Sequence, residues 1–235
     1  MCCLKKSKLI VCIALMLGMT ANIFAITILW DGDTSRDWHD KANWDYDAVP
    51  ASRNDVVINQ DANCADANCI IYKNAACHNL SVSNGSTTGP SRLTLNAGTL
   101  KVNYCAYLGN TWGNNSIVDI NGGTFEVASW LYAGYEGNST INLDAGTIKC
   151  GGLSMEQSTS LIDIKKGTLV VDSYTTASTI KQFVTDGKIK AYSGTGTVVV
   201  DYNSTDNKTF VTATVAAKTE PAVKGKSESE AETSK

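Results

Sequence analysis

Carboxylate and amide side chains recur at fixed places in a repeated segment and are the residues best suited to bind a ligand. Two outward series are expected, one made of Thr94, Asp119, Asn142 and Asp163 and the other of Asn96, Asn121, Asp144 and Lys165. Oxygen ligands of this kind hold calcium at about 2.3–2.6 Å, and they also bind sugar hydroxyls. The same residue types fill ordinary solvated strands and turns. Calcium or sugar binding and a purely structural role therefore both remain open for these residues.

A second acidic group lies near the start of the chain, but its spacing does not fit the Asp-x-Asp-x-Asn-Gly pattern of a calcium loop. It consists of Asp31, Asp33, Asp37, Asp40, Asp45 and Asp47. No cofactor is therefore expected, with calcium as the alternative, and no metal site is assigned.

Aromatic residues form a second candidate surface. Tyr107 and Tyr132 are expected to share one outward register, with Trp130 beside them. Aromatic rings can stack on sugar faces or anchor a protein partner. The alternative is that these rings only pack beneath longer loops, such as those that contain Trp112 and Tyr135.

Catalysis is not expected from these residues. Asp119 and Asp163, two coils apart, would be roughly 9.6 Å from each other, which is near the spacing of a carboxylate pair that hydrolyses glycosides. A lyase or hydrolase would also need a basic group near its substrate. All three arginines precede residue 93, at the N-terminal end of the repeat. His39 and His78 lie too early to build a nucleophilic triad. We therefore predict a protein without enzymatic activity, with a polysaccharide lyase or glycoside hydrolase as the alternative.

An internal repeat positions all of these side chains. Glycines recur 25, 23 and 21 residues apart at Gly98, Gly123, Gly146 and Gly167, each followed by Thr, and Gly187 extends the series after another 20. Within each unit apolar and polar residues alternate, which is typical of short strands with one buried face. The residues expected to point inward are Leu93/Leu95, Val118/Ile120, Ile141/Leu143 and Ile162/Ile164 in the first strand, Leu100/Val102, Phe125/Val127, Ile148/Cys150 and Leu169/Val171 in the second, and Ala106/Leu108, Leu131/Ala133 and Leu153/Met155 in the third. Equivalent strands stacked in parallel at about 4.8 Å predict an all-β, single-stranded parallel β-helix, or β-solenoid, of four to five coils.

The segments outside the repeat are expected to cover its ends, where bare strand edges would otherwise invite aggregation. Trp30, Trp38 and Trp44 suggest an N-terminal cap, and two strands between residues 197 and 215 suggest a closing pair. The predicted organisation is a signal peptide at 1–25, a cap at 26–66, coils at 67–196, the closing pair at 197–215 and a disordered tail at 216–235.

The first 25 residues predict export. Three lysines precede an apolar run and a small-residue exit that ends at Ala25, which is the layout of a secretory signal. No later run is long enough to span a membrane, so the mature chain is expected at the cell surface, in the periplasm or outside the cell. Removal of the leader changes the net charge from −3 to −6, which argues against nucleic-acid binding.

Five cysteines follow the leader. Cys64, Cys69 and Cys77 are near enough in sequence for disulfides among them in an oxidising space. Cys150 falls on an inward ladder and is expected to be a buried, unpaired and inert thiol. Cys105 is expected at an outward position, two coils from Cys150 and beyond disulfide reach.

Several motifs resemble the Gly/Thr-rich β-solenoid surface proteins of planctomycete-type and related bacteria, which are similar to autotransporter-associated and pectate-lyase-like repeats. They are Ala42-Asn43-Trp44, Val49-Pro50, Asn74-Ala-Ala-Cys77-His-Asn-Leu-Ser-Val82, the Asn-Gly-Gly-Thr coils and the segment from Ile189 to Tyr202. The resemblance implies a structural or adhesive role at the cell surface, with polysaccharides or other surface proteins as partners. It transfers no catalytic residue.

Overall fold

The computed structural model describes residues 25–59, 68–85 and 89–216. Nearly all of the predicted signal peptide, Cys64 and nearly all of the predicted tail lie outside these ranges. The described chain is a β-solenoid of about six turns with one α-helix, so the prediction of stacked parallel coils is confirmed. The coil number exceeds the predicted four to five, because the strands at 27–30 and 55–58, in the predicted cap, also join the stack.

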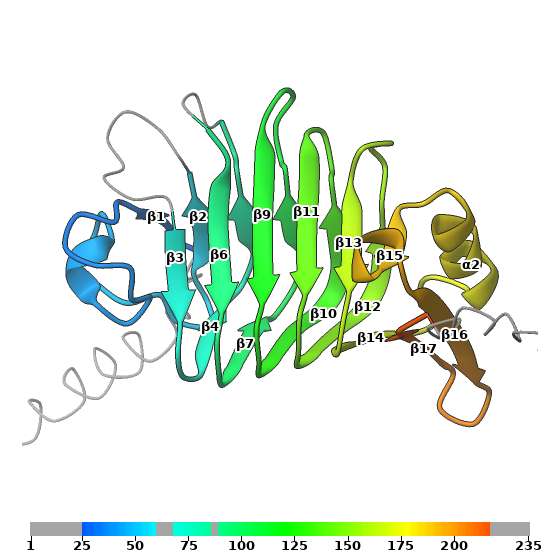
Figure 1. Cartoon of the computed structure of the whole chain (residues 1–235). Helices are drawn as coiled ribbons and strands as arrows, with labels where there is room; N and C mark the ends of the chain where they lie inside the picture. The colour runs from blue at the N-terminus through cyan, green and yellow to red at the C-terminus, as the bar shows by residue number, and fades with distance from the viewer. Residues whose placement is uncertain (1–24, 60–67, 86–88, 217–235) are drawn as a thin grey trace, which may run out of the picture.

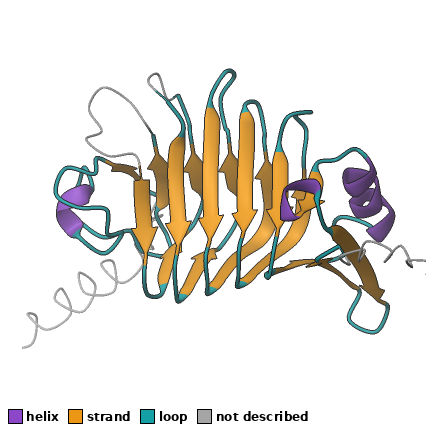
Figure 2. Ribbon diagram, viewed as in Figure 1, coloured by secondary structure: helices purple, strands orange, loops and turns teal. Residues whose placement is uncertain are grey.

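Short strands make up the coils, and the helical segments lie towards the two ends (Figures 1 and 2). The strands are β1 Thr27–Trp30, β2 Asp55–Ile58, β3 Asn68–Ile71, β4 Ala75–Cys77, β5 Leu80–Val82, β6 Ser91–Leu95, β7 Thr99–Val102, β8 Ala106–Leu108, β9 Asn115–Ile120, β10 Thr124–Ala133, β11 Asn138–Leu143, β12 Thr147–Ser154, β13 Leu161–Ile164, β14 Thr168–Val171, β15 Ile189–Ala191, β16 Thr197–Asn203 and β17 Lys208–Thr214. The helical segments are η1 Lys41–Asn43, α2 Ala177–Thr185 and η2 Tyr192–Gly194.

Three faces enclose the core. Face A is the six-stranded parallel sheet β3-β6-β9-β11-β13-β15. Face B stacks β4, β7, the first half of β10, the first half of β12, and β14. Face C stacks β1, β2, β5, β8 and the second halves of β10 and β12. The long strands β10 and β12 therefore bend around the corner between faces B and C.

Each face sends alternate side chains into one continuous apolar core, as the two-residue alternation predicts. On face B the column runs through Leu100, Phe125, Ile148 and Leu169, all fully buried. The inward positions predicted for all three strands of the repeat are confirmed, because every one of them is buried.

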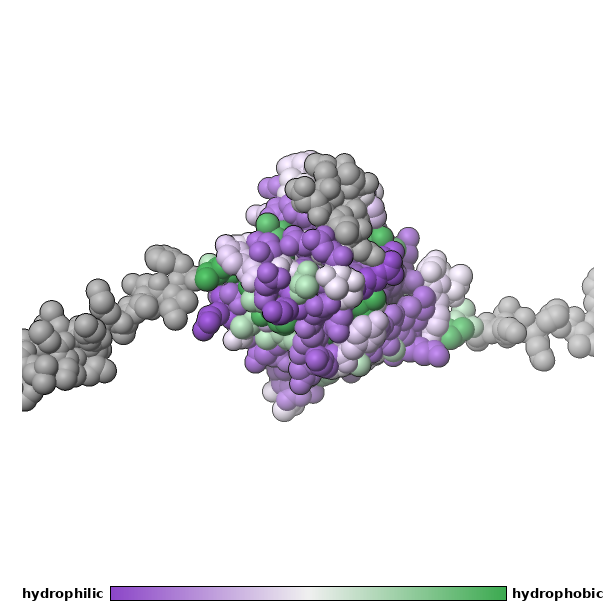
Figure 3. Space-filling model, turned by 90° about the vertical axis from the view of Figure 1, so that its left-hand side faces the viewer, coloured by the Kyte–Doolittle hydropathy of each residue, from purple (hydrophilic) through white to green (hydrophobic). Residues whose placement is uncertain are grey.

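The ends of the solenoid differ from a simple repeat. Residues 36–38 pair with β3 through Ile70, and Trp44 forms a bridge with Trp30 on β1. Trp30, Trp38 and Trp44 are buried and meet edge to face at centroid distances of 4.9 Å. Seen from this end, the surface is mostly hydrophilic (Figure 3).

At the other end, β17 pairs antiparallel with β14, and β16 pairs antiparallel with β17. The α-helix α2 was not predicted. It occupies the stretch between β14 and β15, where the repeat suggested a further coil, and it buries Ile180 in the core. Thr176 caps its first turn by accepting a hydrogen bond from the Thr179 amide.

Candidate functional site

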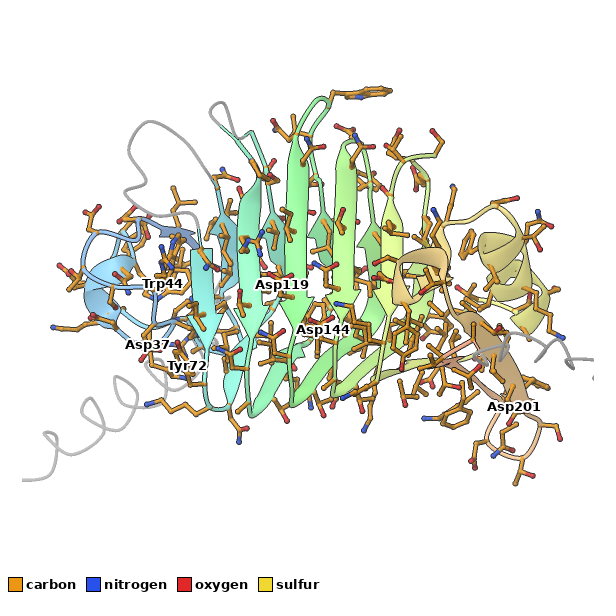
Figure 4. All side chains as sticks on the ribbon, in the orientation of Figure 1. Asp37, Trp44, Tyr72, Asp119, Asp144 and Asp201 are labelled. Carbon is orange, nitrogen blue, oxygen red and sulfur yellow. The ribbon has the colours of Figure 1, made fainter. Side chains whose placement is uncertain are left out.

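The first outward polar series lies in register on face A. Thr94, Asp119, Asn142 and Asp163 occupy equivalent places on β6, β9, β11 and β13, so the alignment inferred from the repeat is confirmed. Asp119 lies on this face, and Asp144 lies where the chain leaves β11 towards face B (Figure 4).

Side chains of the protein itself already bind these carboxylates. Asp119 accepts a hydrogen bond of 2.7 Å from the Asn142 amide and forms an ion pair with Arg92. Asp163 is 5% exposed and accepts hydrogen bonds from the backbone amide and the hydroxyl of Ser193, at 2.8 and 3.1 Å. The expectation that no arginine lies near these carboxylates is wrong, because β6 lies beside β9 and brings Arg92 to Asp119.

The second polar series is also internally paired. Asn121 donates a hydrogen bond of 2.9 Å to Asn96, and the Lys165 ammonium lies 2.7 Å from the Asp144 carboxylate. This contact raises the pKa of Lys165 and offsets the charge of Asp144. The Asn and Asp side chains of both series therefore form cross-coil contacts, which fits the structural alternative better than a calcium site.

The acidic group near the start of the chain also has local partners. Asp45 accepts a hydrogen bond from the Leu29 amide, Asp40 accepts one at the start of η1, and Asp37 lies 3.3 Å from His39. Within the described ranges, no group of three or more His, Cys, Asp or Glu residues could hold a metal ion.

A run of five aromatic rings on and beside face C is the most distinctive feature of the outer surface. We call it the aromatic stripe, and it consists of Tyr107, Trp130, Tyr132, Tyr135 and Tyr174. Tyr107 and Tyr132 are register partners on β8 and β10, and their rings stack at 5.0 Å with an interplanar angle of 3°. Their predicted shared outward register is confirmed.

Three further rings extend this pair. Trp130 stacks on Tyr132 at 6.0 Å and on Tyr174 at 6.0 Å. Tyr135 meets both Tyr107 and Tyr132 edge to face, at 5.5 and 5.2 Å. Tyr174 is 59% exposed and the other four rings are half-buried. The rings pack on one another and all five residues remain partly exposed, so packing and binding are compatible here.

The contribution of Tyr174 was not predicted, because this residue lies outside the repeat in the loop after β14. The consecutive glycines Gly151 and Gly152 are the sequence feature that could have indicated a further ring packed against this strand. Trp130 is the register partner of Gly152, and a Cβ atom there would lie 2.7 Å from the Trp130 ring and 2.9 Å from Tyr174. The absence of a side chain at this position makes room for the stack.

The tyrosines at the centre of the stripe are harder to ionise than exposed tyrosines. Partial burial, followed by the neighbouring Cys105, raises the pKa of Tyr107 to about 12. Burial and the same cysteine also raise the pKa of Tyr132. Both phenols therefore remain neutral hydrogen-bond donors across the physiological pH range.

The cysteines do not extend this surface. Cys77, Cys105 and Cys150 are buried and free. A disulfide that includes Cys77 is therefore not formed, and the pairing of Cys64 lies outside the described residues. Cys105 is 3% exposed rather than outward, because it lies in the bend before β8 against Tyr107.

The thiols of Cys77 and Cys150 should not react in the folded protein. Burial raises the pKa of both thiols, and the thiolate is the reactive form. Mass spectrometry after treatment with iodoacetamide at neutral pH should find both residues unmodified until denaturant is added. Native-state alkylation of Cys150 at the rate of a free thiol would contradict its position on the inward column.

Two open grooves are lined by residues outside the stripe. One, of about 290 Å³, lies between the start of α2 and the β16–β17 pair and includes Asp172 and Tyr202. The other, of about 360 Å³, lies beside β4 and includes Trp38 and Lys101. The stripe is therefore a surface along the solenoid and belongs to neither groove.

Comparisons with models of protein families, with curated proteins and with solved structures found no match. Among the described residues, no helix has both the length and the apolar character that crossing a membrane requires.

Proposed function

We propose that this protein binds an extended polysaccharide along the aromatic stripe, as an exported structural or adhesive component of the cell surface or extracellular matrix. The observation that carries the proposal is the row of five contacting rings on the outside of the solenoid. Aromatic rings combine apolar contact area with polar groups that bond to hydroxyls. A stiff stack of coils would present them to a long polymer as one continuous surface.

The pairing of the carboxylates supports binding of the polysaccharide without its cleavage. Asp119 is paired with Arg92, and Asp163 is held by Ser193. Each would have to leave these partners to act as an acid, a base or a nucleophile. Release of reducing ends or unsaturated products from a polysaccharide would overturn binding without cleavage and favour a hydrolase or a lyase.

Loss of the central rings should weaken retention on a polysaccharide gel. We expect the double substitution Trp130→Ala, Tyr132→Ala to weaken binding at least about tenfold, because each ring contact contributes about 1 kcal/mol. Affinity electrophoresis of the mature chain against a broad polysaccharide panel, with and without calcium, measures this effect.

A matched control for this experiment is Trp112→Ala. Trp112 is 75% exposed and lies in the loop between β8 and β9, so its removal should leave both retention and fold unchanged. Circular dichroism must show that the double variant keeps its strand content. If no polymer in the panel retains the wild-type chain, the protein is a passive scaffold and the binding proposal fails.

We also propose that the tryptophan cluster and the β16–β17 pair act as caps that keep the solenoid monomeric. The contacts of residues 36–38 with β3, and the bridge between Trp30 and Trp44, support this role for the first cap. The antiparallel pairing of β17 with β14 supports it for the second, because the parallel stacking of face B stops there. Truncation after Gly196 removes the pair but keeps α2 and β15, and light scattering should then find larger assemblies if the pair is a cap.

A further inference from the structure

The outward side chains of face C carry almost no charge. One outward column runs through six strands in register and consists of Leu29, Val57, Ser81, Tyr107, Tyr132 and Ser154. None of these residues is ionised at neutral pH. The aromatic stripe therefore lies on a surface formed by apolar and hydroxyl-bearing side chains.

The second outward column of face C adds one charged residue, Asp55, at the far end from Trp130. Its Oδ1 accepts hydrogen bonds from the Asn79 backbone amide and side chain, at 3.1 and 2.9 Å, and lies 3.0 Å from His78 Nδ1. These contacts tie the carboxylate to the protein through Oδ1. At the Trp130 end the same column holds only Trp130 and Gly152.

The other two faces are charged at equivalent positions. The outward column of face B includes Lys101, Glu126 and Lys149, which are register partners on β7, β10 and β12. Face A carries Arg92, Asp119, Asp163 and Lys190 on its strands. The absence of lysine and arginine from the strand residues of face C is thus a property of this face and not of the solenoid as a whole.

Three charged groups at the borders of the stripe are held by or lie close to other groups of the protein. Glu156 lies close enough to Tyr132 to help raise the pKa of that phenol. Lys188 comes near this border, but its ammonium donates hydrogen bonds to the carbonyl oxygens of Met155 and Glu156. Before Tyr174, Asp172 is paired with Lys208 at 3.2 Å.

We infer that the ligand of the aromatic stripe is an uncharged polysaccharide, an inference that rests on the function proposed above. A carboxylated or sulfated polymer would lose part of its hydration on face C and find no lysine or arginine there to pair with, which is costly. A neutral polymer loses no charge hydration. Its hydroxyls can bond to the Tyr and Ser hydroxyls, and its apolar faces can lie against the ring edges.

Pairs of polymers that share a backbone and differ in the charge of their substituents test the inference. The mature chain is run in affinity gels that contain hydroxyethyl cellulose or carboxymethyl cellulose, and methyl-esterified or free polygalacturonate. Any other polymer that retains the chain is compared with its own derivative in which primary hydroxyls have been oxidised to carboxylates. We expect the neutral member of a pair to bind at least about tenfold more tightly, a difference of 1.4 kcal/mol.

A charge-introducing variant makes the test specific to face C. The double substitution Ser81→Lys, Ser154→Lys adds cations on both sides of Tyr107 and Tyr132 in the same column, and it should create retention on the carboxylated polymers. Thr140→Lys, Leu161→Lys places the same added charge on two register partners of face A and should not. Circular dichroism checks that both variants remain folded.

The outcomes separate the two proposals. Retention that depends on Trp130 and Tyr132 but is equal or stronger on the carboxylated polymer would overturn the uncharged ligand and leave the binding function intact. Retention on no polymer at all would overturn the binding function and the inference with it. A face A variant that gains as much retention as the face C variant would also overturn the inference, because the added charge would then act without regard to the stripe.

Discussion

Phe125→Ala should lower the free energy of unfolding by about 3–5 kcal/mol, the usual cost of deleting a fully buried aromatic side chain. Phe125 is 0% exposed and lies on the inward column of face B between Leu100 and Ile148. Its removal would leave a cavity in the middle of the stack, where neighbouring coils on both sides prevent collapse. Urea unfolding followed by circular dichroism measures the change.

Trp112→Ala is the control for this substitution, because it removes an even larger ring from a position that is 75% exposed. It should change the free energy of unfolding by less than about 0.5 kcal/mol. A loss below about 1 kcal/mol for Phe125→Ala would show that the coils do not pack around this ring. Repeat proteins can unfold in parts, so the slope of the transition should be compared between the variants.

Gly123→Ala should destabilise the protein by about 2–4 kcal/mol, combining backbone strain with a steric collision between coils. Gly123 has φ of +71°, a conformation that disfavours side chains. A Cβ atom at this position would also collide with the carbonyl oxygen of Gly98 in the preceding coil. The turn would have to move away from its neighbour, which would weaken the pairing of β10 with β7.

Gly113→Ala separates the two contributions. Gly113 has a similar φ of +79°, but no atom lies within 4 Å of the place its Cβ would take. It should cost only the strain, about 1 kcal/mol. Thermal unfolding of both variants measures the difference in stability. Equal losses of stability in the two variants would show that contact between successive glycine turns does not limit the spacing of the coils.

The core could be predicted from the sequence because its determinants are local and periodic. Alternation with a period of two decides which side chains point inward within a strand. The Gly-Thr repeat then aligns one strand with the next, so that Leu100, Phe125, Ile148 and Leu169 were placed correctly on one column. A shift by one residue would expose the entire column, which makes this register unambiguous.

The helix α2 could not be predicted from the same signal. The glycine series continues to Gly187, but the segment before it contains no alternating strand pattern, and residues 177–185 form a helix that covers the core with Ile180. Burial of an apolar stripe against the last coil stabilises this short helix, and tertiary contacts of that kind outweigh local propensity.

The candidate site was predictable in part. The shared register of Tyr107 and Tyr132 followed from the repeat, whereas Tyr174 reaches the stripe from a loop whose path no repeat specifies. The polar series was aligned correctly. Its side chains were candidates for ligand binding, but the structure shows that they bond to other side chains of the protein. Arg92 and Asp119 are 27 residues apart in the chain and are paired only because β6 lies beside β9.

The sequence by itself determined the kind of fold, the inward columns of the repeat and the outward position of the central rings, since each depends on the spacing of residues within a strand or between equivalent turns. Only the tertiary structure decided which polar groups are already satisfied, which loop completes the aromatic stripe and which face lacks charge. These properties depend on distances between side chains from different coils and loops. Such distances also depend on where the loops return and on how side chains of neighbouring coils orient, and neither is encoded in local spacing.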